Sequence, residues 1–102
     1  MNYRPLPSSV TIKPSDIDGL GLFAVKRIPA ERFLGIGWLK AELAHDGYWR
    51  TPLGGFINHS DTPNCIKMSK DDPTSEYVFL RVGDKDIEMG EELTVTYTFY
   101  QL

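Results

Sequence analysis

Several features that would define other classes of protein are missing from this 102-residue sequence. Cys65 is the single cysteine, so the chain cannot form an internal disulfide, and a reducing intracellular compartment is expected. No apolar run approaches the roughly 18 residues that cross a bilayer, and residues 1–10 contain no apolar signal segment. We therefore predict a cytoplasmic protein that does not contact a membrane.

An excess of basic residues is also missing. The 11 Lys and Arg residues stand against 14 Asp and Glu, which gives a formal net charge of −3. Because proteins that bind nucleic-acid backbones usually carry a basic stripe, no nucleic-acid partner is expected. A net acidic chain instead favours basic partners, such as lysine-containing segments of other proteins.

What the sequence does contain is a series of short β-like runs, separated by 9 glycines and 7 prolines. The clearest strands are Tyr77–Val82 and Leu93–Tyr100, which are rich in β-branched and aromatic residues. The weaker candidates for extended structure are Val10–Lys13, Leu22–Ile28 and Phe33–Trp38. The pattern predicts one mostly-β domain over residues 1–102, built from several small sheets, with residues 1–9 as an extended arm.

Little helix is expected. Leu39–His45 is the best helix candidate, and it is short. Asp46–Gly55 is predicted to be loop, and Asp16–Gly21 a turn, because Asp18-Gly19 is a strong turn dipeptide.

The stretch "GLGLFA", Gly19–Ala24, fits G-x-G-x-x-A, a form of the dinucleotide-binding fingerprint. That site needs a helix directly after the glycines. Pro29 follows Ala24 too closely for such a helix to form. We therefore prefer a tight turn or bulge, in which the glycines let main chain come close to another group.

The stretch "GGFINHSDTPNC", Gly54–Cys65, holds the residue types of several sites. His59-Ser60-Asp61 has the composition of a hydrolase triad, but adjacent residues rarely converge and a G-x-S-x-G motif is absent. His59 and Cys65 are too few for a closed zinc site, so no metal is expected. Asn58 and His59 follow the apolar Phe56-Ile57, and either the protein's own backbone or a polar ligand would satisfy their hydrogen bonds.

Tyr97 lies in the last predicted strand. Val95, Tyr97 and Phe99 share one face of that strand, because side chains alternate with a period of two. Taken alone, Tyr97 is best interpreted as a core residue whose hydroxyl binds a backbone carbonyl.

Three segments in this order resemble one known family: "GLGLFA" (19–24), "GGFINHSDTPNC" (54–65) and "GEELTVTY" (90–97). Together they resemble the SET domain of protein lysine methyltransferases. The resemblance implies a fold of several small curved sheets, with little helix. It also implies a C-terminal strand threaded under the Asn-His-Ser segment as a pseudoknot, an exception to the usual unthreaded chain.

The resemblance further implies S-adenosylmethionine as cofactor and a lysine side chain of a protein as methyl acceptor. Tyr97 matches the catalytic tyrosine of the family, and Tyr100 and Tyr77 are candidates for the wall of the lysine channel. The residues expected to bind the cofactor are Gly19, Leu20, Gly21, Phe56, Asn58 and His59.

Two positions depart from the family pattern. Gly55 stands where the family usually has an arginine that contacts the cofactor, and Lys67 stands where some members have a channel tyrosine. These departures keep a second hypothesis open, namely a catalytically weak or inactive module that retains the fold for binding or regulation. A second copy of the chain would complete the substrate groove, so a homodimer is an expected assembly.

Overall fold

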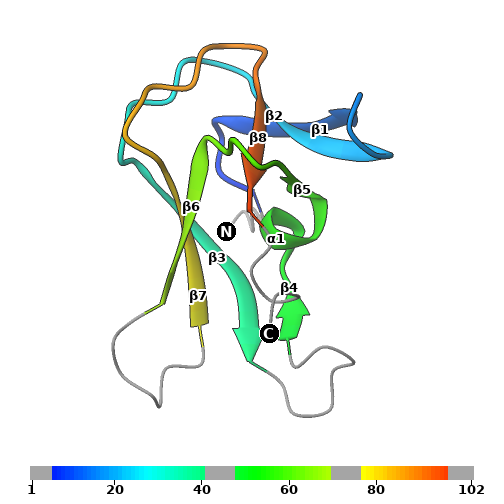
Figure 1. Cartoon of the computed structure of the whole chain (residues 1–102), viewed down its shortest axis with the longest axis vertical. Coiled ribbons are helices and arrows are strands. Elements are labelled where there is room, and N and C mark those ends of the chain that lie inside the picture. Colours follow the sequence, from blue (N-terminus) through cyan, green and yellow to red (C-terminus); the bar gives the residue numbers. More distant parts are fainter. Residues whose placement is uncertain (1–5, 41–47, 70–76, 97–102) are drawn as a thin grey trace.

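The structure is a computed structural model that describes residues 6–40, 48–69 and 77–96 (Figure 1). Within these ranges the chain forms two four-stranded sheets, in the orders β1-β2-β8-β5 and β4-β3-β7-β6, and one short helix. The prediction of a mostly-β fold with small sheets and little helix is confirmed. The elements are β1 (Val10–Pro14), β2 (Leu20–Ala24), β3 (Phe33–Lys40), β4 (Tyr48–Arg50), α1 (Pro52–Phe56), β5 (Asn58–His59), β6 (Cys65–Ser69), β7 (Tyr77–Val82) and β8 (Glu92–Val95).

The first sheet contains both the first and the last of the described strands, β1 and β8. Strands β1 and β2 form an antiparallel hairpin whose turn ends at Gly19, with φ at +42° in the left-handed region that glycine tolerates. Strand β2 then pairs with β8, and β8 pairs in parallel with β5 through Asn58 and Thr94, and His59 and Val95. The last described strand therefore lies directly against the Asn-His-Ser segment, as expected for the family fold.

The second sheet has one face toward the core and one toward solvent. Directly opposite residues share a face, so Cys65 and Lys67 of β6 lie on the same side as their partners Val82 and Leu80 of β7. Val82 and Leu80 are fully buried, which identifies this side as the core face. Tyr77 alternates with the core-facing residues of β7 and is 43% exposed on the outer face.

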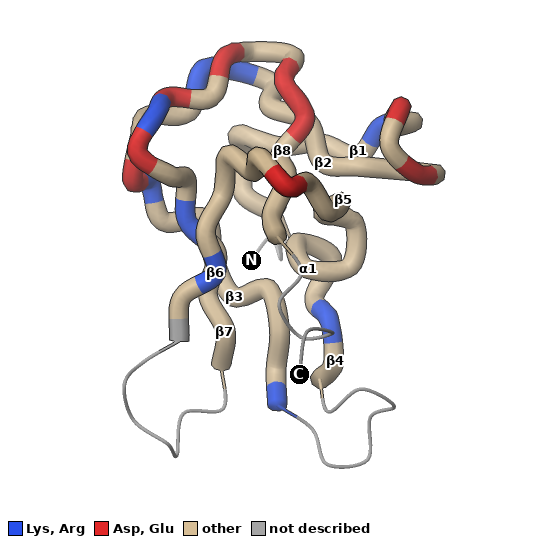
Figure 2. The backbone as a smooth tube through the Cα atoms, in the orientation of Figure 1, with Lys and Arg blue, Asp and Glu red and all other residues tan. Residues whose placement is uncertain are grey.

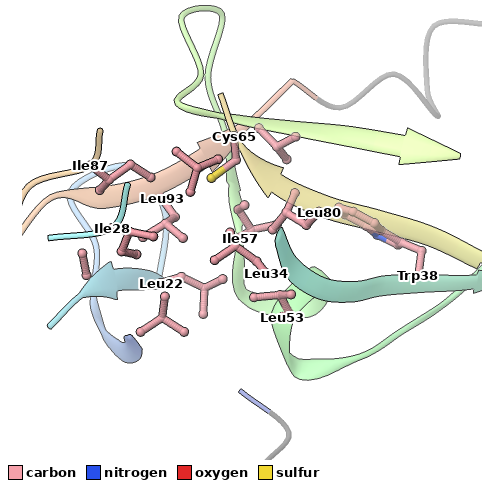
Figure 3. Packing of buried hydrophobic residues seen from close by; sticks show 14 residues of the cluster. Leu22, Ile28, Leu34, Trp38, Leu53, Ile57, Cys65, Leu80, Ile87 and Leu93 are labelled. Atoms are coloured by element: carbon pink, nitrogen blue, oxygen red, sulfur yellow. The ribbon is translucent and has the colours of Figure 1, made fainter. Parts of the chain in front are cut away.

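The two sheets enclose one hydrophobic core (Figure 3). Leu22, Ile28 and Leu93 pack on the side of the first sheet, whereas Leu80 and Trp38 pack on the side of the second. Fully buried Ile57, which follows α1, lies between these two groups. Because Ile57 directly precedes Asn58, the core fixes the start of β5.

Charged residues gather on the connections 25–32 and 83–91, at the edge of the molecule away from α1 (Figure 2). The two connections are tied together by a bridge between Ile28 and Ile87 and by an ion pair between Arg27 and Asp86. Asp86 also accepts a hydrogen bond from Ala30 N at 2.7 Å. The Ala30 N–H, followed by Arg27, lowers the pKa of the Asp86 carboxyl below its ordinary value.

Helix α1 lies where loop was predicted. Thr51 is its N-cap and Pro52 occupies the first turn, a combination that starts helices. Gly54 and Gly55 favoured the loop interpretation, but Gly54 is required by packing: a Cβ there would lie 2.1 Å from Gly37 O. The prediction of loop over Asp46–Gly55 was therefore wrong for β4 and α1.

Other boundaries also differ from the sequence-based prediction. Strand β2 ends at Ala24, although extended structure was predicted over Leu22–Ile28, and β8 ends at Val95, before Thr96, although a strand was predicted over Leu93–Tyr100. Leu39 and Lys40 were predicted to begin a helix, but they continue β3 and pair with Trp49 and Tyr48 of β4. The remainder of Leu39–His45 lies outside the described residues. Asn58 and His59 were expected at the junction of a buried strand and a loop, and they instead form the short strand β5 after α1.

Candidate functional site

Three side chains from distant parts of the chain meet beside the β1–β2 turn. Asn58 Nδ2 lies 2.8 Å from Glu92 Oε2 and 3.1 Å from Ser15 Oγ, and Ser15 Oγ donates to the Glu92 carboxylate at 2.7 Å. The backbone carbonyls of Asp18 and Leu20 lie 3.2 and 3.3 Å from the same Asn58 nitrogen. We call Ser15, Asn58, Glu92 and these two carbonyls the Asn58 cluster.

The cluster presses against the backbone of Gly21. A Cβ at this position would lie 2.2 Å from Glu92 Oε2 and 3.1 Å from Asn58 Nδ2. Only glycine therefore leaves room for the carboxylate and the amide as they stand. This confirms that a glycine of "GLGLFA" allows close approach to main chain, and it identifies the approaching groups. Strand β2 follows the glycines, whereas a dinucleotide site would need a helix there.

The Asn58 cluster is rich in hydrogen-bond acceptors. A carboxylate, a hydroxyl and two carbonyl oxygens converge, and the Asn58 amide is their shared donor. Such a set suits a cationic group with several N–H donors, such as an ammonium. The site residues Ser15 and Glu92 escaped the sequence-based prediction, and the only sequence signal for Glu92 was its place in "GEEL".

Asn64 holds the loop between β5 and β6 against β8. Its side-chain Nδ2 donates to Glu92 O at 2.8 Å, and its Oδ1 accepts from Thr94 N at 2.8 Å. Its backbone N donates to Thr94 Oγ1 at 3.3 Å. The Asn64 side chain thus makes hydrogen bonds to the β8 backbone of the kind that a neighbouring strand would make.

The "HSD" sequence does not form a hydrolase arrangement. His59 Nε2 lies 3.1 Å from Asp61 Oδ1, and the Asp61 side chain is 97% exposed, so solvent screens the pair. Ser60 Oγ accepts from Thr62 N at 3.0 Å. The hydroxyl therefore shapes the turn after β5.

A small hollow lies at the opposite end of β8, between β6 and β8. Cys65, Ile66, Lys67, Val95 and Thr96 line it, and its volume is about 240 Å³. This is below the roughly 300–1,000 Å³ of pockets for drug-sized ligands, and it suits a single side chain. We call it the β6–β8 hollow.

Lys67 is a cationic residue that lines the β6–β8 hollow. The Lys67 Nζ atom is buried and lies 5.7 Å from the centre of the Trp38 ring. Burial lowers the pKa of this amine below its ordinary value, because desolvation disfavours the charged form. The neighbouring Cys65 thiol has its pKa raised to about 12, again chiefly by burial.

The structure brings some of the predicted site residues together and leaves others untested. Gly19, Leu20, Gly21 and Asn58 lie at the Asn58 cluster, while His59 follows on β5. Phe56 ends α1 and packs against the core, half-buried. Tyr77 lies on the outer face of β7 against Phe79, away from the β6–β8 hollow. Tyr97 and Tyr100 lie outside the described residues.

Two kinds of feature are absent from the described residues. No group of three or more His, Cys, Asp and Glu side chains in residues 6–40, 48–69 and 77–96 is arranged to hold a metal ion. Within the same ranges, no helix is long and apolar enough to cross a membrane.

Comparison with known proteins gives a consistent result. The profile of the SET domain matches residues 37–98, which is more than half of the chain. No curated protein matches the chain by sequence. Among solved structures, the chain is similar to a candidate histone methyltransferase from Plasmodium falciparum, with a TM-score of 0.65 and 20% sequence identity. The match covers 89% of this chain and 94% of the Plasmodium chain, so the two share a fold over nearly their whole length. A match to this profile supports a methyltransferase activity in general. Because the profile covers more than half of the chain, this chain belongs to the SET-domain family.

Proposed function

We propose that this chain is a protein-lysine methyltransferase that uses S-adenosylmethionine as methyl donor. The observation that carries the proposal is the Asn58 cluster, where acceptor oxygens converge beside Gly21. When bound, S-adenosylmethionine would supply a sulfonium methyl, and the ammonium of its amino-acid end suits these oxygens. The residues present therefore fit the cofactor that the resemblance implies.

The donor-binding residues would act mainly through polar contacts and close approach. The Asn58 cluster would hold the ammonium, with Glu92 as counter-charge and Ser15 as the group that orients it. Gly21 would keep the space open, because any side chain there would displace Glu92. The full set proposed to bind the donor is Gly19, Leu20, Gly21, Phe56, Asn58 and His59, together with Ser15 and Glu92.

The acceptor must be a neutral amine, since an ammonium has no lone pair to donate. A free lysine has a pKa near 10.4 and is largely protonated at neutral pH. The apolar lining of the β6–β8 hollow would disfavour the charged form. Tyr97, the residue after Thr96, would orient amine and methyl through its hydroxyl, and Tyr100 and Tyr77 remain candidates for the channel wall.

A second candidate function is a binding or regulatory module without turnover. One observation favours it: Lys67, a cationic residue, lines the hollow in which an acceptor amine would lie. Gly55, in place of the usual arginine, removes one expected donor contact. The two candidates differ in whether donor binding leads to transfer.

The expected assembly is a cytoplasmic homodimer. Phe33, Ile66 and Tyr77 leave exposed apolar surface on the outer side of the second sheet, with 55%, 40% and 43% of each residue accessible. A second copy of the chain would cover such surface. Sedimentation equilibrium tests the dimer, and a monomer at all concentrations would contradict it.

The function is tested by two measurements on the same protein. Calorimetric titration with S-adenosylmethionine should show saturable binding. Incubation with methyl-labelled S-adenosylmethionine and lysine-rich protein should then label lysine. Binding without label on any protein supports the module, and the absence of binding contradicts both candidates.

A further inference from the structure

Lys13 is a charged residue beside the Asn58 cluster that the proposed mechanism does not use. It lies on β1, directly opposite Gly21 of β2. Directly opposite residues of an antiparallel pair share a face, with their Cβ positions about 4.5–5.5 Å apart. A Cβ at Gly21 would meet Glu92 Oε2 and Asn58 Nδ2. The Lys13 side chain therefore begins beside the place where the Asn58 cluster covers β2.

One face of the first sheet carries a cation and a carboxylate on either side of β2. Leu22 and Leu93 are directly opposite and fully buried, so they mark the core face. Phe23 and Glu92 are the next opposite pair and therefore lie on the outer face, which Lys13 shares because the register alternates. Lys13 Nζ lies 5.3 Å from the centre of the Phe23 ring. In the order β1-β2-β8, the positive charge is on the first strand and the negative charge on the third.

The Lys13 ammonium is available to a ligand. The residue is exposed, and no carboxylate among residues 6–40, 48–69 and 77–96 forms an ion pair with it. It lies over the Phe23 ring instead, a kind of contact that is weak at exposed sites. Because a lysine side chain in water is protonated at neutral pH, Lys13 supplies a positive charge that an anionic group can approach.

The chemistry of the methyl donor calls for such a cation. The amino-acid end of S-adenosylmethionine carries an ammonium and a carboxylate on one carbon atom. The oxygens of the Asn58 cluster suit the ammonium, but the Glu92 carboxylate repels the carboxylate of the donor. A cation on the other side of β2 offsets this repulsion, and the strand register puts Lys13 there.

We propose that Lys13 binds the carboxylate of the methyl donor and so selects a donor with a complete amino-acid end. The proposal rests on the proposed function, which assigns the ammonium of the donor to the Asn58 cluster. Glu92 and Lys13 then bind the two opposite charges of one zwitterion, and the Lys13 amine leaves the Phe23 ring. No covalent bond forms or breaks at Lys13, so its effect is on donor affinity and donor selectivity.

Two ligands that differ only in the carboxylate provide the test. Calorimetry compares S-adenosylmethionine with its decarboxylated analogue, in which a hydrogen replaces the carboxylate while the ammonium and the sulfonium remain. The ratio of the two affinities should fall about three- to tenfold in Lys13→Met relative to wild type, as expected for one charge-assisted contact at an exposed site. The affinity of Lys13→Met for the cationic analogue should equal or exceed that of wild type, because a like charge has been removed.

Matched variants separate this inference from the proposed function. Lys13→Arg keeps the charge and should retain most of the wild-type ratio, whereas Lys85→Met removes an exposed lysine elsewhere and should retain all of it. Salt should reduce the effect of Lys13→Met, since solvent-exposed charges are screened. An unchanged ratio, or an equal loss of both affinities, would overturn the inference and leave the proposed function intact. If wild type binds neither ligand, the proposed function fails, and the inference with it.

A spectroscopic measurement locates the contact. In protein with ¹³C-labelled lysine, the Cε signal of Lys13, assigned by its loss in Lys13→Arg, should move on saturation with S-adenosylmethionine, whereas that of Lys85 should not. A Lys13 signal that stays fixed at saturation would contradict the contact with the carboxylate of the donor.

Discussion

The two ends of β8 have different chemical surroundings. At the Glu92 end, polar groups from β5, β8 and the β1–β2 turn converge in a hydrogen-bonded cluster beside a glycine backbone. At the Val95 end, the surroundings are apolar and hold one buried amine over an indole ring. One end is suited to hold a charged group, whereas the other is suited to keep an amine neutral.

Under the proposed function, this difference would separate donor binding at one end of β8 from methyl transfer at the other. Both ends are positioned by the same short strand, which the parallel pairing to β5 and the side chain of Asn64 hold in place. Mutations at the two ends should therefore have different consequences. Changes at the Glu92 end should alter donor affinity, and changes beyond Val95 should alter transfer.

The largest effect is expected from Tyr97→Phe. Removal of the hydroxyl should lower the transfer rate about 100-fold or more, by analogy with the loss of one positioned hydrogen-bond donor. Donor affinity should change little, because the Asn58 cluster is untouched. Initial rates with labelled donor, alongside calorimetry, measure both quantities. Full activity in the variant would remove Tyr97 from the mechanism.

Asn58→Ala is expected to weaken donor binding. Loss of the shared amide leaves polar partners unsatisfied and should weaken donor binding by about 1–3 kcal/mol. The matched control is Asn64→Ala, which removes hydrogen bonds to the backbone of β8 and none within the Asn58 cluster. It should lower the melting temperature more than the donor affinity of the folded protein. Equal donor affinity in wild type and Asn58→Ala would argue against the donor site.

Two adjacent glycines of α1 test how closely this helix packs against β3. Gly54→Ala would place a Cβ 2.1 Å from Gly37 O, and we expect destabilisation of about 1–3 kcal/mol from overpacking. Gly55→Ala meets only Arg50 Cβ at 3.8 Å and should be neutral or stabilising by up to about 1 kcal/mol. Urea denaturation gives both free energies of unfolding. Similar values for the two variants would contradict the close contact between α1 and β3.

The last effect, which is absent at neutral pH, concerns Cys65 beside the β6–β8 hollow. Burial raises its pKa from 9.0 to about 12 in the folded protein. The unfolded chain therefore loses its thiol proton first, and the stability present below pH 9.0 should be lost progressively as pH rises toward about 12. Cys65→Ala should show a weaker decline over this range. Parallel stability curves for wild type and variant would contradict the buried thiol.

Local patterns in the sequence were enough to predict some of these features. Tyr77–Val82 was predicted with the observed bounds, because β-branched and aromatic residues dominate it. The close approach at "GLGLFA" also followed from residue type. Leu39 and Lys40 were mistaken for helix, because their pairing with β4 is a tertiary contact that local periodicity does not encode.

The Asn58 cluster shows why the rest of the site was not predictable. Ser15 and Glu92 are 77 residues apart, and Asn58 and Glu92 are 34 apart. Only the folded order β1-β2-β8-β5 brings them together. Helix α1 was missed for a related reason. Its Thr51-Pro52 start was visible, but the need for Gly54 arises from the distant backbone of Gly37.

The most direct test of the account is residue-resolved NMR during a titration with S-adenosylmethionine. The side-chain amide signals of Asn58 and the backbone signals of Gly19, Leu20 and Gly21 should shift and saturate together, whereas Phe79 on the outer face should not respond. That result would locate the donor at the Glu92 end of β8. Absence of shifts at these residues, or saturable shifts confined to another surface, would contradict the assignment of the Asn58 cluster as the donor site.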